Sequence, residues 1–133
     1  MKEYKLQIVT PDGVIYDGLV ESLLLRCSTG DVEILAGHTD LFASVGIGRA
    51  RIKAAASTLI GSVAGGFISV IGGEVKLVAT TFEFKDDIDL ERARAAKERA
   101  EERVKNARSD KETALAKAKL QRAINRINIA LLK

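Results

Sequence analysis

The sequence predicts a β + α protein, with an N-terminal antiparallel β-sandwich followed by a C-terminal antiparallel two-helix hairpin. Two observations support this prediction. All 11 glycines and the single proline lie before residue 74, where short apolar runs alternate with turn residues. Beyond residue 86, apolar side chains instead recur every three or four positions, as they do along one face of a helix.

The net charge changes at the same place as the composition. Residues 1–85 hold eight Lys and Arg against nine Asp and Glu, whereas residues 86–133 hold 13 against nine. A joint change of this kind indicates a domain boundary. We therefore expect a sandwich domain at 1–85 and a hairpin domain at 86–133, in a chain long enough for one compact core with an appendage.

Apolar stretches separated by turns predict the strands of the first domain. They are LQIV at 6–9, VIY at 14–16, VESLLLRC at 20–27 and GFISVIGGEVKLVATTFEF at 66–84. The end of the last stretch alternates in the manner of a half-buried strand. One side of it carries Val75, Leu77 and Ala79, and the other carries Lys76 and Thr80.

Residues 54–73 contain no charged side chain and are as long as a membrane-spanning helix. They also include Gly61 and Gly65 at the spacing of a helix-dimer motif. Five glycines and four Ser or Thr residues make the segment only weakly hydrophobic, and its glycine pairs are typical of turns between strands. We therefore expect strands here and no membrane span. The N-terminal residues show no apolar signal core, so we expect no export signal.

Two amphipathic helices are predicted in the second domain. The apolar positions of the first are Ala93, Ala96, Ala100, Val104 and Ala107, and those of the second are Leu120, Ile124, Ile127 and Leu131. Asp87 and Asp89 place cap acceptors and negative charge where the first helix begins. Ser109 and Glu112 have the spacing of a capping box for the second helix. The short connection predicts an antiparallel hairpin.

Arginines recur on both predicted helices. If the chain turns near residues 108 and 109, Arg92 lies near Arg126, and Arg99 lies within about a turn of Lys119 and Arg122. Guanidinium groups have forked donors that match phosphate oxygens, so a polyphosphate ligand is one interpretation of this cluster. In the other interpretation, the arginines face solvent and form ion pairs at helix spacing with Glu91, Glu98, Glu101 and Glu102.

The second helix is basic throughout its later part. No acidic residue follows Glu112, whereas the cations there are Lys117, Lys119, Arg122, Arg126 and Lys133. Such a helix suits a partner with an acidic surface. Aromatic residues are scarce and the first domain has no basic excess, which argues against a nucleic-acid-binding module.

No catalytic or metal-binding pattern is present. The single cysteine, Cys27, cannot form an internal disulfide, which favours a reducing compartment, and the single histidine, His38, lies in a predicted turn. One Cys and one His do not make a zinc site of the usual kind. The glycine-rich segments lack the Gly-Lys-Ser/Thr ending of a P-loop. We therefore expect a protein that is not an enzyme.

Taken together, several segments make the chain resemble the epsilon subunits of bacterial F-type ATP synthases. These are LQIVTPDGVIYDG, GDVEILAGHTDLFASVGIG, AGGFISV, DIDLERARAAKERAEERV and LQRAINRINIALL, which span nearly the whole chain. Two departures from the family pattern are Ala36, where proline is usual before Gly37 and His38, and Asp40, where proline is also common. They affect the expected contact with the rotor ring, not the expected fold.

The resemblance implies a ten-stranded β-sandwich followed by a helical hairpin, in a subunit with no catalytic residues. It implies a place in the central stalk at the cytoplasmic face of the membrane, with the gamma subunit, the c-ring and the beta subunit as partners. It also implies that the subunit helps to couple ion flow to ATP synthesis. The hairpin in this family either folds down or extends, and the extended form inhibits ATP hydrolysis.

The resemblance further implies a regulatory ATP site, with or without magnesium. The family signature at the start of the first helix is matched by Ile88, Asp89, Arg92 and Ala93. The remaining positions are matched by Glu83, Arg99, Arg122 and Arg126. We expect the adenine base near Glu83, Ile88, Asp89 and Ala93, and the phosphates near the four arginines. The alternative is a structural coupling subunit whose hairpin does not sense nucleotide.

Overall fold

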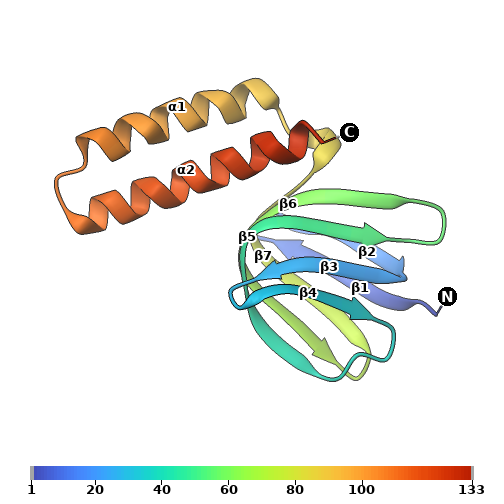
Figure 1. Ribbon diagram of the computed structural model, residues 1–133. Helices are drawn as coiled ribbons and strands as arrows, with labels where there is room; N and C mark the ends of the chain where they lie inside the picture. Colours follow the sequence, from blue (N-terminus) through green and yellow to red (C-terminus); the bar gives the residue numbers. More distant parts are fainter. Residues whose placement is uncertain (1, 133) are drawn as a thin grey trace. The chain divides into compact units, whose positions relative to one another are not determined.

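The computed structural model describes residues 2–132 and divides the chain into two compact units, Met1–Lys85 and Asp86–Lys133. The first unit is a β-sandwich and the second is a helical hairpin (Figure 1). The elements, in chain order, are β1 (Tyr4–Thr10), β2 (Gly13–Val20), β3 (Ser22–Cys27), β4 (Gly30–Leu35), β5 (Leu41–Lys53), β6 (Thr58–Ile71), β7 (Glu74–Phe84), the 3-10 turn η1 (Lys85–Asp87), α1 (Leu90–Asn106) and α2 (Asp110–Ala130).

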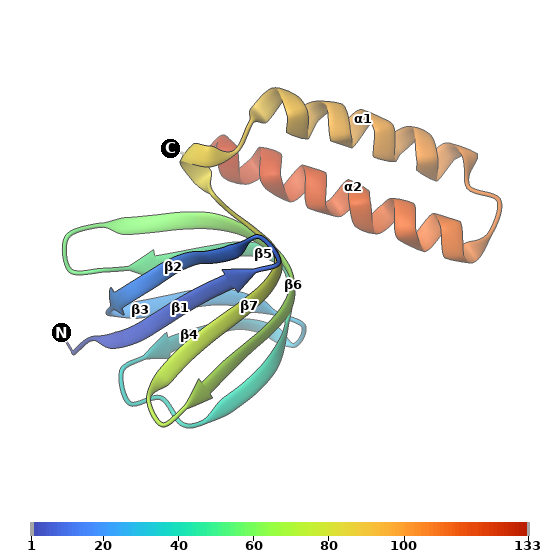
Figure 2. The same ribbon diagram turned by 180° about the vertical axis from the view of Figure 1, so that it is seen from behind.

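The strands form one curved seven-stranded sheet in the order β2-β1-β7-β6-β5-β3-β4 (Figure 2). Five of the six strand pairs are antiparallel, as the turn-rich sequence predicts. The pair β1–β7 is parallel, with Leu6 opposite Val75 and Ile8 opposite Leu77. This pairing joins strands from the two ends of the unit, so a short turn cannot impose an antiparallel arrangement on it.

The strand count differs from the ten implied by the family resemblance. β5 and β6 are long, and their pairing is interrupted between Ser44↔Phe67 and Ile47↔Ala64. Gly65 and Gly66 have positive φ at this interruption, and a methyl group at Gly66 would collide with the carbonyl of Val78. A count that divided the long strands at such irregularities would be higher than seven.

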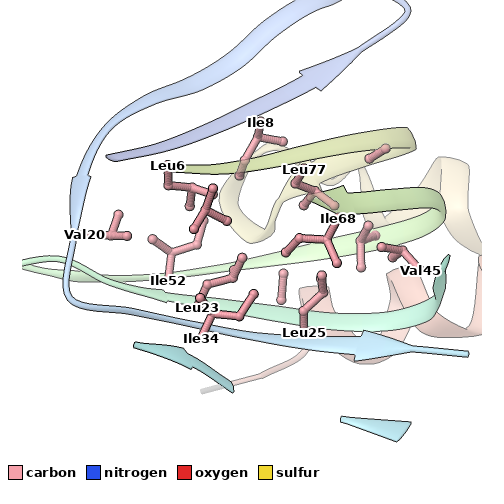
Figure 3. Packing of buried hydrophobic residues seen from close by; sticks show 14 of the residues in the cluster. Leu6, Ile8, Val20, Leu23, Leu25, Ile34, Val45, Ile52, Ile68 and Leu77 are labelled. Carbon is pink, nitrogen blue, oxygen red and sulfur yellow. The ribbon is translucent and has the colours of Figure 1, made fainter. Parts of the chain in front are cut away.

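The core of the sandwich consists of aliphatic side chains from all seven strands (Figure 3). The largest fully buried ones are Leu6, Ile8, Val20, Leu23, Leu25, Ile34, Ile52, Val63, Ile68, Val70 and Leu77. Each such side chain contributes about 1.5–3 kcal/mol when removed from water, which gives the first unit its own hydrophobic core. In β7, Val75, Leu77 and Ala79 are buried while Lys76 and Thr80 are exposed, which confirms the predicted alternation.

The uncharged segment of the sequence is a strand and not a helix. Thr58–Ile71 forms β6 in the middle of the sheet, and residues 72–73 form the turn into β7. Among residues 2–132, no helix is long and apolar enough to cross a bilayer. The expectation of strand structure in this segment is therefore confirmed, but the turn expected at Gly65–Gly66 is wrong, because both glycines lie inside β6.

Both helices of the hairpin begin at predicted caps. The Asp89 carboxylate accepts a hydrogen bond of 3.1 Å from the backbone N–H of Arg92. The Ser109 hydroxyl accepts one of 3.1 Å from the N–H of Glu112, whose own carboxylate accepts one of 2.9 Å from the N–H of Arg108. These bonds satisfy amide groups that the helices leave without partners, and they set the turn between α1 and α2.

The helices pack through alanines spaced by seven residues. Ala93 and Ala100 are buried on α1, as predicted, and Ala116 and Ala123 are buried on α2. The prediction for α2 was wrong for Ile124 and Leu131, which are 36% and 55% exposed, whereas the predicted Leu120 and Ile127 are half-buried. A small side chain lets two helix backbones approach closely, so alanines occupy most of the seam, and Ile129 is the large apolar residue of α2 that is buried.

Candidate functional site

Cationic side chains form a strip along one side of each helix. On α1, Arg92, Arg99 and Arg103 are separated by seven and four residues, so they share one side of the helix. On α2, Lys119, Arg122 and Arg126 are separated by three and four residues and form the equivalent strip. We call these six residues the cationic face.

A cavity between the helices shows that the two strips lie on the same side of the hairpin. Arg103 of α1 and Lys119 of α2 both line this cavity, which has a volume of about 320 Å³. The other residues that line it are Asn106, Ala107, Glu112, Leu115 and Ala116. α1 and α2 run side by side and antiparallel (Figure 1). From their residue spacing, the two strips therefore continue together from Arg103 and Lys119 toward Arg92 and Arg126.

The ion pairs between arginines and glutamates that were expected if the arginines face solvent are not formed within residues 2–132. Within residues 2–132, no carboxylate lies within 4.0 Å of the side chains of Arg92, Arg99 or Arg122. Arg92 and Arg99 are exposed, and Arg122 is half-buried. Like charges on Arg92, Arg99 and Arg122 that no carboxylate neutralises favour the binding of an anion.

The four predicted arginines are therefore placed on one face, and the other hairpin residues have different surroundings. Ile88 is half-buried just before α1. One carboxylate oxygen of Asp89 is used by the helix cap, which leaves the second for another donor. Ala93 is fully buried in the alanine seam, so its methyl group supports helix packing in this structure.

Glu83 belongs to the other compact unit. It lies near the end of β7, is half-buried and is opposite Ser62 of β6. Its predicted place beside the adenine base therefore depends on the family resemblance.

Arg103 is a member of the cationic face that the sequence prediction omitted. Its spacing of four residues from Arg99 was the signal that could have identified it.

In the sandwich, the single cysteine and the single histidine have surroundings typical of structural residues. Cys27 is 2% exposed, and burial raises the pKa of its thiol, with the charge of Asp31 raising it further. Nδ1 of His38 lies 2.7 Å from the carbonyl oxygen of Thr39, within a turn. Among residues 2–132, no group of three His, Cys, Asp or Glu side chains could hold a metal ion.

Comparison with known protein families shows to which family the chain belongs. The model of the ATP synthase delta/epsilon chain β-sandwich domain matches residues 3–85, and that of the delta/epsilon chain long α-helix domain matches residues 86–130. The chain belongs to the ATP synthase delta/epsilon family. This confirms the resemblance, which the sequence segments indicated.

Individual relatives agree with the family models over nearly the whole chain. The chain is 42% identical to the ATP synthase epsilon chain of Bacillus velezensis, over 98% of both proteins. It is 41% identical to that of Bacillus subtilis, again over 98% of both. Alignments of this coverage include both the sandwich and the hairpin.

Solved structures share the fold at low sequence identity. A chain of the Euglena gracilis mitochondrial ATP synthase matches with a TM-score of 0.82 and 20% identity, over 98% of this chain and 82% of that one. A chain from the central stalk and c-ring of the Tetrahymena thermophila mitochondrial ATP synthase matches with a TM-score of 0.70 and 8% identity, over 97% of both. These chains share the fold of this protein with few residues in common.

Proposed function

We propose that the chain is a non-catalytic subunit of the central stalk of an F-type ATP synthase, and that its hairpin responds to ATP. In this role the subunit couples ion translocation to ATP synthesis and restrains ATP hydrolysis. Family membership and the full-length relatives support the first part. Solved neighbours in F1, c-ring and central-stalk assemblies are consistent with the same position.

The cationic face carries the proposal that ATP is the ligand. Arg92 and Arg99 of α1 and Arg122 and Arg126 of α2 lie on the side of the hairpin where both cationic strips meet. Each guanidinium can donate two parallel hydrogen bonds to phosphate oxygens, and a triphosphate has enough charge and length to engage several of them. Ile88, Asp89 and Glu83 then serve the adenine base, as the family resemblance implies.

In this proposal, ATP acts by shifting the equilibrium between the folded and the extended form of the hairpin. A ligand that binds the folded hairpin better than the extended one stabilises the folded form by its difference in affinity. At a concentration 100 times its dissociation constant, this stabilisation amounts to about 2.7 kcal/mol. That free energy shifts a balanced equilibrium about a hundredfold toward the folded hairpin and relieves inhibition.

The proposed partners follow from the same role. The sandwich contacts the gamma subunit and the c-ring at the cytoplasmic face of the membrane, and the extended hairpin contacts the beta subunit. The basic character of α2 supports the last contact, because no acidic residue follows Glu112. Magnesium can accompany ATP, since no cluster of protein ligands for a metal is needed for that.

Calorimetry on the full chain tests the ATP proposal. Titration with ATP at millimolar concentration should give a saturable heat with one site per chain. Absence of binding would leave a structural coupling subunit whose hairpin does not sense nucleotide. In the assembled complex, deletion of residues 86–133 should then abolish regulation of hydrolysis and leave coupling intact if the hairpin is the switch.

A further inference from the structure

The loop before β5 and the turn between β6 and β7 lie at the same end of the sheet. β5 and β6 pair antiparallel, with Leu41 opposite Val70, so the start of β5 lies beside the end of β6. The loop at 36–40 therefore adjoins the turn formed by Gly72 and Gly73. Both segments belong to the sandwich unit, so the relationship between them is fixed within that unit.

The β6–β7 turn leaves one backbone donor for another segment. Ile71 pairs with Glu74, and the two residues between them, Gly72 and Gly73, have φ of 57° and 82°. Positive φ at both positions is typical of a type I′ turn, in which the ladder hydrogen bonds belong to the flanking pair. The N–H of Gly72 therefore needs an acceptor outside its own hairpin. It donates a hydrogen bond of 3.1 Å to Oδ1 of Asp40.

The 36–40 loop is constrained by further contacts of its own. The N–H of His38 donates a hydrogen bond of 3.1 Å to the carbonyl of Leu35, and Gly37 between them has φ of 80°. This combination is typical of a type II turn. Nδ1 of His38 also lies 2.7 Å from the carbonyl oxygen of Thr39. The backbone is therefore held up to the residue before Asp40, and the carboxylate extends from a constrained segment to the neighbouring turn.

The hydrogen bond between the loop and the turn sets the relative position of two large apolar side chains. Phe42 follows the loop and is 71% exposed, and Ile71 precedes the turn and is 67% exposed. Phe42 is opposite Ser69, and Ile71 is two residues from Ser69, so Phe42 and Ile71 project from the same face of the sheet. Phe42 also stacks on Phe67 of β6, with ring centroids 4.9 Å apart.

We propose that Asp40 is a positioning residue for the contact between the sandwich and the c-ring. The inference rests on the proposed stalk function, in which the c-ring contacts the sandwich. By joining the loop to the turn, the carboxylate holds Phe42 and Ile71 in one arrangement before the c-ring binds. Segments that are ordered in advance lose less conformational entropy on binding, so they bind more tightly than two loops that move separately.

Three variants of the full chain separate the hydrogen bond from the charge. Asp40→Ala removes the acceptor, whereas Asp40→Asn keeps a carbonyl oxygen and removes the charge. Asp12→Ala, at an exposed position of the β1–β2 turn, is the matched control for the loss of one carboxylate. Amide hydrogen exchange at Gly72 should become about fivefold faster in Asp40→Ala and stay near the native rate in Asp40→Asn and Asp12→Ala.

Binding to the rotor is measured with a purified subcomplex of the gamma subunit and the c-ring. Asp40→Ala should weaken the affinity of the full chain by about fivefold, because the two loops are then ordered only on binding. Asp40→Asn and Asp12→Ala should stay within about twofold of the native chain. Phe42→Ala should also weaken binding, but without changing the exchange of Gly72, because it leaves the Asp40 acceptor in place.

The outcomes distinguish this proposal from the stalk function. If the native chain does not bind the subcomplex, the stalk function fails and the role of Asp40 fails with it. If the native chain binds and Asp40→Ala binds equally well, the stalk function stands and the positioning role is overturned. Equal losses in Asp40→Ala and Asp40→Asn would assign the effect to charge and would also overturn it.

Discussion

The hydroxyl group of Tyr4 donates a hydrogen bond of 2.7 Å to the backbone carbonyl of Ile34, which ties β1 to β4 across the interior of the sandwich. Tyr4 is 6% exposed and Ile34 is fully buried, so water cannot replace this bond. The pairing joins the second strand of the sheet order to its last strand and closes the two layers on each other.

Removal of this hydroxyl should destabilise the sandwich. Tyr4→Phe leaves the carbonyl of Ile34 without its donor, at a cost of about 1–2 kcal/mol in the free energy of unfolding. Urea denaturation measures this change. Tyr16→Phe is the matched control, because the Tyr16 hydroxyl makes no hydrogen bond within residues 2–132. Equal stability of Tyr4→Phe and the native chain would show that the bond contributes nothing.

The burial of Tyr4 also predicts that the stability of the sandwich decreases at high pH. Burial raises the pKa of the Tyr4 hydroxyl well above its usual value, and the charge of Glu33 raises it further. Above about pH 10 the unfolded chain loses this proton while the folded chain keeps it, so stability falls as pH rises. The slope is about 1.4 kcal/mol per pH unit for one group. The stability difference between the native chain and Tyr4→Phe should therefore shrink above pH 10, and a constant difference would contradict the assignment.

The α2 cap predicts a local loss of stability in the hairpin. Ser109→Ala removes the acceptor for the Glu112 N–H and should cost about 1 kcal/mol. Amide hydrogen exchange in the first turns of α2 should then be about fivefold faster. Ser57→Ala, in the β5–β6 turn, serves as the control. Unchanged exchange at the start of α2 would mean that the cap does not support the helix.

The alanine seam predicts intolerance of large side chains. Ala123 is 3% exposed, and Ala123→Leu should destabilise the hairpin by about 1–3 kcal/mol, because added atoms separate the helices. Ala114→Leu adds the same atoms at an exposed position of α2 and should be nearly neutral. Thermal unfolding followed by circular dichroism compares the two. If both variants are equally stable, the helices are not closely packed at this seam.

The cationic face predicts which arginines affect ATP affinity. Arg92→Ala and Arg122→Ala should each weaken ATP by about 1.5–3 kcal/mol, roughly tenfold to more than a hundredfold. Arg94→Ala is the control, since Arg94 is an exposed arginine of α1 two positions from Arg92 and therefore on another side of the helix. Calorimetry gives the three affinities. Equal affinities would mean that the phosphates bind elsewhere.

The sequence indicated the second domain more completely than the first. Helix periodicity and the caps at Asp89 and Ser109 identified both helices and their turn, because these signals are local in the chain. In the sandwich, β4 and β5 were not predicted as strands, and the parallel pairing of β1 with β7 was not predicted. Pairing of strands distant in sequence depends on which surfaces are buried together, and no local pattern records that.

In the candidate functional site, too, local spacing predicted part of the arrangement and helix packing set the rest. The spacing of Arg92 and Arg99 and of Arg122 and Arg126 placed each pair on one side of its own helix. Whether two such strips lie on the same side of a hairpin depends on how the helices are rotated about their axes. The alanine seam sets that rotation, and the cavity shared by Arg103 and Lys119 reveals it.

By itself the sequence determined the helix caps, the alternation of β7, the spacing of the arginines on each helix, and the resemblance to the delta/epsilon family. Only the tertiary structure decided which helix faces meet. The prediction of Ile124 and Leu131 as the seam failed because hydrophobicity measures the tendency of a side chain to leave water, whereas close helix packing also selects for small volume. Alanines therefore fill most of the contact, and the cationic face lies on one side of it.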